Sequence, residues 1–75
     1  MFDIKQLLIN LEDKFPDCKV TMSEELDAYQ FNLQSEKFEV SVSIPRVRII
    51  QAQNISALTE LVCSELKNVA DVYLQ

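Results

Sequence analysis

The sequence has no glycine and no histidine, and each absence excludes a class of functional site. Histidine is the side chain whose unperturbed pKa lies near neutral pH, so the usual general base is missing. Glycine-rich loops cradle the phosphates of nucleotides, and no such loop can form here. We therefore expect a protein that is not an enzyme and that carries no cofactor.

Cysteine is also scarce, since the chain has only Cys18 and Cys63, far apart and in no CxxC arrangement. Two reduced and largely buried thiols are typical of a cytoplasmic protein, and we favour this interpretation over a single disulfide. A zinc ion would need both thiolates and two carboxylates, which is an uncommon ligand set. No metal is therefore expected.

Long apolar runs are missing as well. Residues 1–15, MFDIKQLLINLEDKF, lack the basic start, long apolar centre and small-residue cleavage site of a signal peptide. No stretch approaches the roughly 20 apolar residues that a membrane span requires. We expect a cytoplasmic protein without a membrane partner.

The chain of 75 residues is expected to form one domain over residues 1–75. A chain of this length buries only about 60–65% of the surface that its unfolded form exposes. Small domains often gain stability from disulfides, a metal or a partner chain. Because the first two are not expected, a homodimer is the remaining source of extra stability. Its contacts would lie between sheet faces or edges, or between the last helices.

An amphipathic helix is predicted at each end of the chain. Asp3 can cap the first helix, and Pro16 ends it because the residue before a proline is pushed out of the α region. Asn54 or Ser56 can cap the last helix. Apolar residues recur at helical spacing in both, at Ile4, Leu7, Leu8, Leu11 and Phe15, and at Ile55, Leu58, Val62, Leu66, Val69 and Tyr73.

Between the helices the apolar period changes to two, which predicts three strands joined by short polar links. The predicted fold is α+β with the order α-β-β-β-(β)-α, in two layers, with both helices packed on one face of an antiparallel meander. The apolar strand positions are Cys18, Val20 and Met22, then Tyr29, Phe31 and Leu33, then Phe38, Val40, Val42 and Ile44. The expected core contains Leu7, Leu11, Phe31, Val40, Val42, Leu58, Val62 and Leu66.

The segment after the third strand reads PRVRII and carries both arginines of the chain. Since proline cannot donate a ladder hydrogen bond, we predict a bend or bulge at Pro45, then a short fourth strand or an extended approach to the last helix. In an extended chain Arg46 and Arg48 share one side. They either neutralise nearby acids such as Glu39 or belong to an edge segment that meets a carboxylate-bearing partner or a second copy. We favour a third interpretation, in which Pro45 and the two charges protect the edge from pairing without any partner.

Acidic residues gather in the first half of the chain, where helix end, loop and turn could place them on a common rim. This acidic set is Asp13, Asp17, Glu24, Glu25 and Asp27. It is interpreted either as a solubilising surface or as a patch that engages a basic protein. The former is the simpler interpretation.

The strand positions that face away from the helices are polar and mostly uncharged. They are Thr21, Ser23, Gln30, Asn32, Gln34, Glu39, Ser41 and Ser43. Short uncharged side chains cost less to desolvate than charged ones, so this face could accept a partner or simply face solvent. The candidate partner-binding residues are thus Asn32 and Ser41, the acidic set, Arg46 and Arg48.

The order of elements resembles that of the double-stranded-RNA-binding domain, which implies a nucleic-acid-binding regulator as the alternative function. Those domains grip phosphates with basic residues at the start of the last helix. Here that position reads NISALTEL, with Glu60 and no cation, and the net charge is −5. Nucleic acid is therefore not the favoured partner.

The favoured function is a non-enzymatic protein–protein interaction module. In size and composition, although not in motif, the chain is similar to small acidic phage inhibitors that block nucleic-acid machinery. We expect an inhibitor or adaptor from a phage or mobile element, with an anti-defence role, that occupies a basic surface of a protein that handles nucleic acid.

Overall fold

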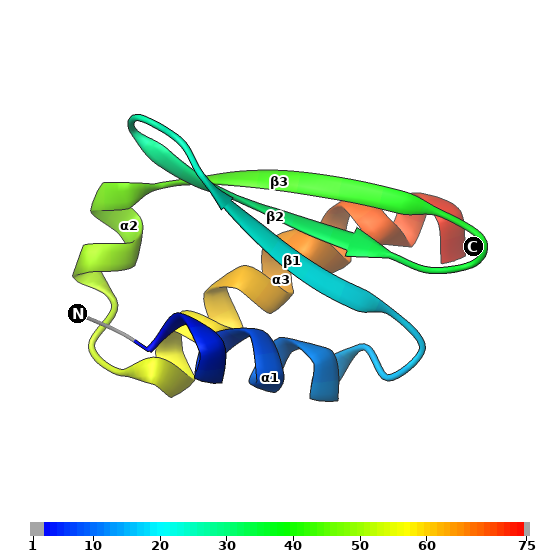
Figure 1. Ribbon diagram of the computed structural model, residues 1–75, viewed down its shortest axis with the longest axis horizontal. Helices are drawn as coiled ribbons and strands as arrows, with labels where there is room; N and C mark the ends of the chain where they lie inside the picture. The colour runs from blue at the N-terminus through cyan, green and yellow to red at the C-terminus, as the bar shows by residue number, and fades with distance from the viewer. Residues whose placement is uncertain (1–2, 75) are drawn as a thin grey trace.

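The computed structural model describes residues 3–74, with side chains for residues 3–73, and has an α+β fold. Its elements are α1 (Ile4–Lys14), β1 (Lys19–Glu24), β2 (Ala28–Gln34), β3 (Glu39–Pro45), α2 (Arg46–Gln51) and α3 (Ile55–Leu74), as Figure 1 shows. The three strands form one antiparallel sheet in the order β1-β2-β3. The prediction of a three-stranded meander with a helix before it and a helix after it is confirmed.

Side-chain caps begin the two long helices. The Asp3 carboxylate accepts hydrogen bonds from the backbone N–H of Lys5 at 3.0 Å and of Gln6 at 3.3 Å. At the start of α3, the Asn54 side-chain oxygen accepts from the backbone N–H of Ala57 at 2.8 Å. Of the two residues that could cap α3, it is therefore Asn54 that does so.

The strand register aligns the apolar positions into one buried face. Met22 of β1 lies opposite Phe31 of β2, and Phe31 lies opposite Val42 of β3. The predicted core residues are all buried except Val42, which is partly buried and packs against the cluster. The buried cluster contains Leu7, Leu11, Val20, Phe31, Leu33, Val40, Ile44, Ile49, Leu58, Val62, Leu66 and Ala70.

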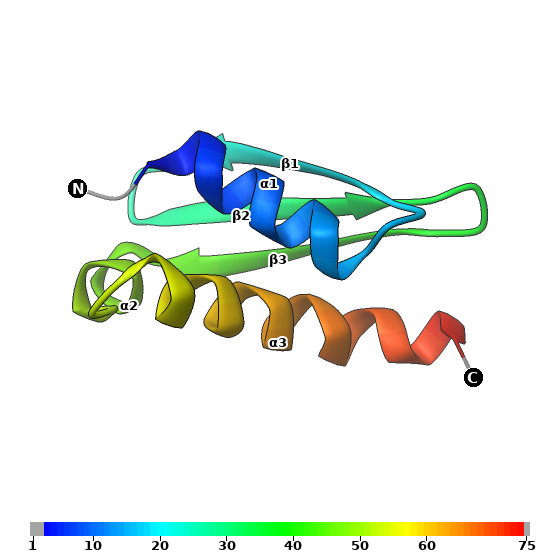
Figure 2. The ribbon, with the colours of Figure 1, turned by 90° about the horizontal axis from the view of Figure 1, so that it is seen from below.

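The long helices contact different parts of the sheet. α1 packs against β1 and α3, whereas α3 packs against β3 and β2. Figure 2, seen from below, shows α1 crossing in front of the strands and α3 running along the outer side of β3. Leu58, Val62 and Leu66 of α3 are fully buried in this core, so its apolar stripe is not free to form a seam with a second copy.

The prediction of a fourth strand or an extended segment after Pro45 is wrong, because residues 46–51 form the short helix α2. Pro45 ends β3 and is the N-cap of α2 with a φ of −56°, which suits the first turn of a helix. α2 is anchored by Ile49, which is buried in the core. Two residues along an α-helix are turned by about 200°, so Arg46 and Arg48 do not share one side as predicted.

The two links between strands are formed without glycine, and no residue from 3 to 74 has a positive φ. In the β2–β3 link the Ser35 hydroxyl accepts from the backbone N–H of Lys37 at 3.1 Å and of Phe38 at 3.2 Å. The Ser35 side chain thus holds this turn by hydrogen bonds, without the positive φ that glycine supplies in many tight turns. The β1–β2 link is held differently, by Arg46.

Replacing Leu58 by alanine should lower the free energy of unfolding by about 2–5 kcal/mol, because a fully buried side chain would leave a cavity. Val42→Ala should cost less, since Val42 is only partly buried. Urea denaturation followed by circular dichroism measures both. Equal effects in the two variants would contradict the assigned core.

Candidate functional site

The guanidinium of Arg46 holds the β1–β2 link at one end of the sheet. Its Nη2 atom donates to the Glu24 carboxylate at 2.7 Å and to the Glu25 carbonyl at 3.0 Å. Its Nε atom donates to the Leu26 carbonyl at 3.1 Å, and its backbone N–H donates to the Asp27 carbonyl at 2.9 Å. Every carbonyl of the link therefore accepts a hydrogen bond from this one residue.

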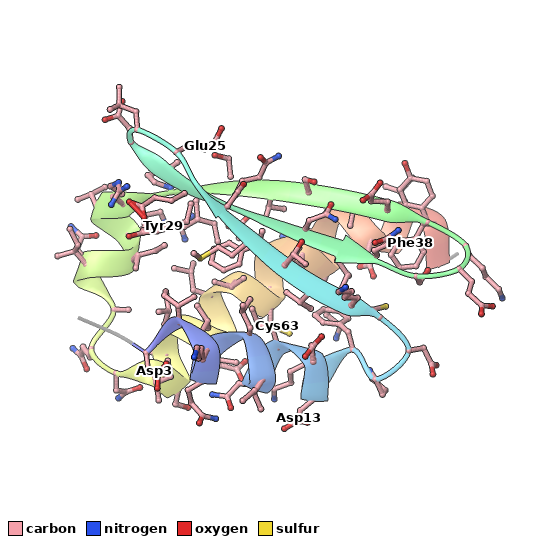
Figure 3. All side chains as sticks on the ribbon, in the orientation of Figure 1. Asp3, Asp13, Glu25, Tyr29, Phe38 and Cys63 are labelled. Carbon is pink, nitrogen blue, oxygen red and sulfur yellow. The ribbon has the colours of Figure 1, made fainter. Side chains whose placement is uncertain are left out.

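Tyr29 of β2 completes the surroundings of Arg46. Arg46 Nη1 donates to the Tyr29 hydroxyl at 3.0 Å, and the guanidinium carbon lies 4.7 Å from the centroid of the tyrosine ring. The hydrogen bond to Glu24 is the main cause that raises the pKa of Arg46 above its usual value. Figure 3 shows Tyr29 near α2, at the end of the sheet where Glu25 lies.

Below this arginine, a cleft of about 520 Å³ opens between the start of α1, the end of β1 and α2. We call it the α2 cleft, and it is lined by Ile4, Met22, Glu24, Tyr29, Arg46, Ile49 and Ile50. Its walls are mostly apolar, and its polar groups belong to Glu24, Tyr29 and Arg46. A concave apolar site with a few convergent polar groups is the usual form of a binding site.

α2 exposes two large apolar side chains beside the cleft. Ile50 is 76% exposed and Val47 is 57% exposed, and their spacing of three residues places them on the same side of the helix. Leu26, on the link that Arg46 holds, is 90% exposed. Single exposed apolar residues are ordinary, but apolar residues gathered around an apolar cleft are typical of an interaction surface.

The structure divides the predicted acidic set into two groups. Glu24, Glu25 and Asp27 lie at the α2 end of the sheet, whereas Asp13 and Asp17 lie where α1 leads into the opposite end of β1. At about 3.3 Å per residue, β1 separates the groups by roughly 20 Å. Figure 3 shows Asp13 and Glu25 far apart. The five acids therefore do not form a common rim.

A second cleft, of about 550 Å³, lies at the end of the sheet that holds Asp17. Its charged lining residues are Lys14, Asp17, Glu36 and Lys37, so cations and anions are mixed there. Such a lining gives no preference for a partner of either charge. The α2 cleft has only one such pair, Glu24 with Arg46, and apart from Tyr29 its other lining residues are aliphatic, so we take it as the candidate site.

The predicted polar face of the sheet is linked by hydrogen bonds between its own side chains. Ser41 Oγ donates to Asn32 Oδ1 at 2.8 Å, and Asn32 Nδ2 donates to Glu39 Oε2 at 2.9 Å. Both arginines pair with acids, but Glu39, the example predicted, is not one of them: Arg46 binds Glu24, and Arg48 binds Glu65 of α3 at 3.3 Å. Asn32 and Ser41 therefore lie together, away from both arginines.

The described residues were also considered for a reactive cysteine, a metal site and a membrane-spanning helix. Burial and the neighbouring Asp17 raise the pKa of the Cys18 thiol, which keeps it protonated and weakly nucleophilic at neutral pH. Within residues 3–74, no group of three or more cysteine and acidic side chains could hold a metal ion. None of the helices in this range is long and apolar enough to cross a membrane.

The sequence analysis did not single out Val47, Ile50 or Tyr29 as site residues. The spacing of Val47 and Ile50 suggests a shared face only once residues 46–51 are known to be helical. Comparisons with protein-family models, with curated proteins and with solved structures find no match to this chain. A function can therefore be proposed only from the residues and geometry of the site.

Replacing Arg46 by alanine should lower the thermal denaturation midpoint and loosen the β1–β2 link, because the carbonyls of Glu25 and Leu26 and the Glu24 carboxylate lose their donor. The backbone N–H of residue 46 remains, so the Asp27 carbonyl keeps its partner. Arg46→Lys should recover only part of the loss, since an ammonium group cannot reproduce the planar fork of a guanidinium.

Hydrogen exchange at the amides of residues 24–29 and a thermal melt measure the effect of these two variants. Arg48→Ala is the matched control, because Arg48 contacts Glu65 and not the link. A larger effect from Arg48→Ala than from Arg46→Ala would contradict the role assigned to Arg46.

Proposed function

We propose that the protein is a non-enzymatic protein–protein interaction module that binds a basic surface of a partner protein through the α2 cleft. The observation that carries this proposal is the exposure of Val47 and Ile50 beside an apolar cleft, at the same end of the sheet as three carboxylates. An apolar side chain of the partner would enter the cleft. Lysine or arginine residues around it would face Glu25 and Asp27.

The charge of the chain supports a basic partner. The net charge is −5, and at the α2 end Arg46 offsets only one of the acids Glu24, Glu25 and Asp27. Opposite charge on the partner would speed association and fix its orientation, while the apolar contact would supply most of the affinity. Proteins that handle nucleic acids carry such basic surfaces. We therefore propose an inhibitor or adaptor of a protein of this class, from a phage or mobile element.

The layer arrangement is part of this proposal. In this arrangement both long helices would cover one face of the sheet and bury the apolar side chains of all three strands. The outer side chains of α2, which follows β3, would then stay uncovered. The polar face of the sheet, with Asn32 and Ser41, would then lie outside the contact through the α2 cleft. The protein would act in the cytoplasm, where its nucleic-acid-handling partner is found.

Replacing Ile50 by glutamate should abolish capture of the partner from a host lysate, since a charge would replace the most exposed apolar side chain at the cleft. Val72→Glu is the matched control, because Val72 is 74% exposed, close to the 76% of Ile50, but lies on α3. Circular dichroism should show both variants folded. Equal capture by the two variants would refute the site.

The alternative function, nucleic-acid binding, is tested by adding duplex RNA or DNA at low salt. Micromolar binding that weakens steeply as salt is added would favour it, because release of counterions from phosphates gives that dependence. We expect no such binding, since the start of α3 carries no cation and has Glu60 in its place.

A further inference from the structure

At the outer edge of β1, three residues direct their backbone N–H and C=O groups away from the sheet. The N–H of Glu25 donates to the carbonyl of Ala28 at 2.9 Å, and these residues are opposite each other in the β1–β2 register. Hydrogen-bonded pairs alternate with non-bonded pairs in an antiparallel ladder. It follows that the odd-numbered residues of β1 bond to β2, whereas Val20, Met22 and Glu24 direct their N–H and C=O groups outward.

Little else occupies this edge. Glu12 of α1 accepts a hydrogen bond from the N–H of Val20 at 3.4 Å, which is longer than the typical range for such bonds. Within residues 3–74, no further side chain bonds to the outward N–H groups of Met22 and Glu24. A free edge of this kind is a template for pairing with another strand.

The opposite edge of the sheet differs. The N–H of Ser35 donates to the carbonyl of Phe38, so by the same alternation the outward groups of β3 belong to Glu39, Ser41 and Ser43. α3 packs on β3 and runs along its outer side in Figure 2, whereas α1 packs on β1 but crosses it in that view instead of running along its outer side. A second domain could therefore approach β1 more freely than β3.

We propose that two copies of the chain form a dimer by antiparallel pairing of their β1 strands about a two-fold axis at Met22. In this register Met22 faces Met22 of the second copy, and Val20 faces Glu24 of the second copy. All outward N–H and C=O groups of the two edges then gain partners. The two sheets join into one sheet of six strands, and each Glu12 releases its long hydrogen bond.

Charge selects this register. On the polar face of the sheet it places Lys19 opposite Glu25 of the second copy, and the two-fold axis forms this pair twice. Opposite charges at facing strand positions are stabilising, whereas like charges are destabilising. Moving the axis to Thr21 would instead place Lys19 opposite Ser23 of the second copy, so this pair of opposite charges would be lost. Moving it to Ser23 would leave Val20 without a facing strand residue.

Exposed apolar side chains border the same edge. Ile9 precedes Glu12 by three residues on α1 and so lies on the side of the helix from which Glu12 reaches β1. It is 53% exposed, and Leu26, on the link that follows β1, is 90% exposed. The proposed register brings the link with Leu26 beside the start of β1 in the second copy, where Cys18 is half-buried. The dimer would thus cover apolar surface that the single chain leaves in water.

The dimer leaves the α2 surfaces available. α2 packs against β3, at the edge of the sheet opposite β1, so the exposed residues Val47 and Ile50 of the two copies would lie away from the junction. The dimer and the proposed binding of a partner are therefore independent. Ile50→Glu should leave the dimer intact.

The test is a charge exchange at the proposed junction, followed by sedimentation velocity over a range of concentrations. Lys19→Glu and Glu25→Lys should each raise the dissociation constant of the dimer by about tenfold or more, because two attractive pairs become repulsive. The double variant, Lys19→Glu with Glu25→Lys, should restore dimerisation. Lys37→Glu makes the same change of charge on the β2–β3 link and should have little effect.

Hydrogen exchange provides a second measurement on the unmodified protein. The amides of Met22 and Glu24 should become protected as concentration rises, while those of Ser41 and Ser43 on the outer edge of β3 should not. A chain that remains monomeric at all concentrations would overturn the proposal. So would a double variant that fails to restore the dimer, or protection confined to the β3 amides.

Discussion

The guanidinium of Arg46 connects the start of α2 to the carbonyls of the β1–β2 link, and the arrangement of that end of the molecule depends on this connection. The carbonyls of Glu25, Leu26 and Asp27 in this link all accept hydrogen bonds from Arg46. The same side chain pairs with Glu24 and lies over the ring of Tyr29. It thereby positions the residues that line the upper part of the α2 cleft.

The two long helices and the three strands could be predicted from the sequence because each contains enough residues to show its period. α2 could not, because six residues include less than two helical turns, and the β-branched residues Val47, Ile49 and Ile50 favour extended structure when taken alone. Tertiary contacts decide the outcome: Ile49 is buried in the core, and the backbone N–H of Arg46 bonds to Asp27. Neither contact is visible in the local sequence.

The candidate site was predicted only in part, for a related reason. Glu24, Glu25 and Asp27 are neighbours in sequence and remain neighbours in the structure, so their grouping could be predicted. Asp13 and Asp17 are almost as close in sequence, but the length of β1 lies between the two groups and separates them. The exposure of Ile50 and Val47 could not be predicted either, since apolar residues after a strand are more often buried. The candidate site therefore depends on the helical conformation of residues 46–51, which the sequence did not predict.

The two edges of the sheet differ in the position of their charges, which decides whether an edge resists or favours pairing with an identical strand. A strand edge is protected when a helix covers its side or when its charges repel an identical strand, and β3 has α3 along it and Pro45 at its end. β1 carries Lys19 at its first residue and Glu25 directly after its last. An antiparallel copy reverses the strand, so these opposite charges attract where two like charges would repel. Lys19 and Glu25 at the two ends of β1 therefore make this edge complementary in charge to an antiparallel copy of itself.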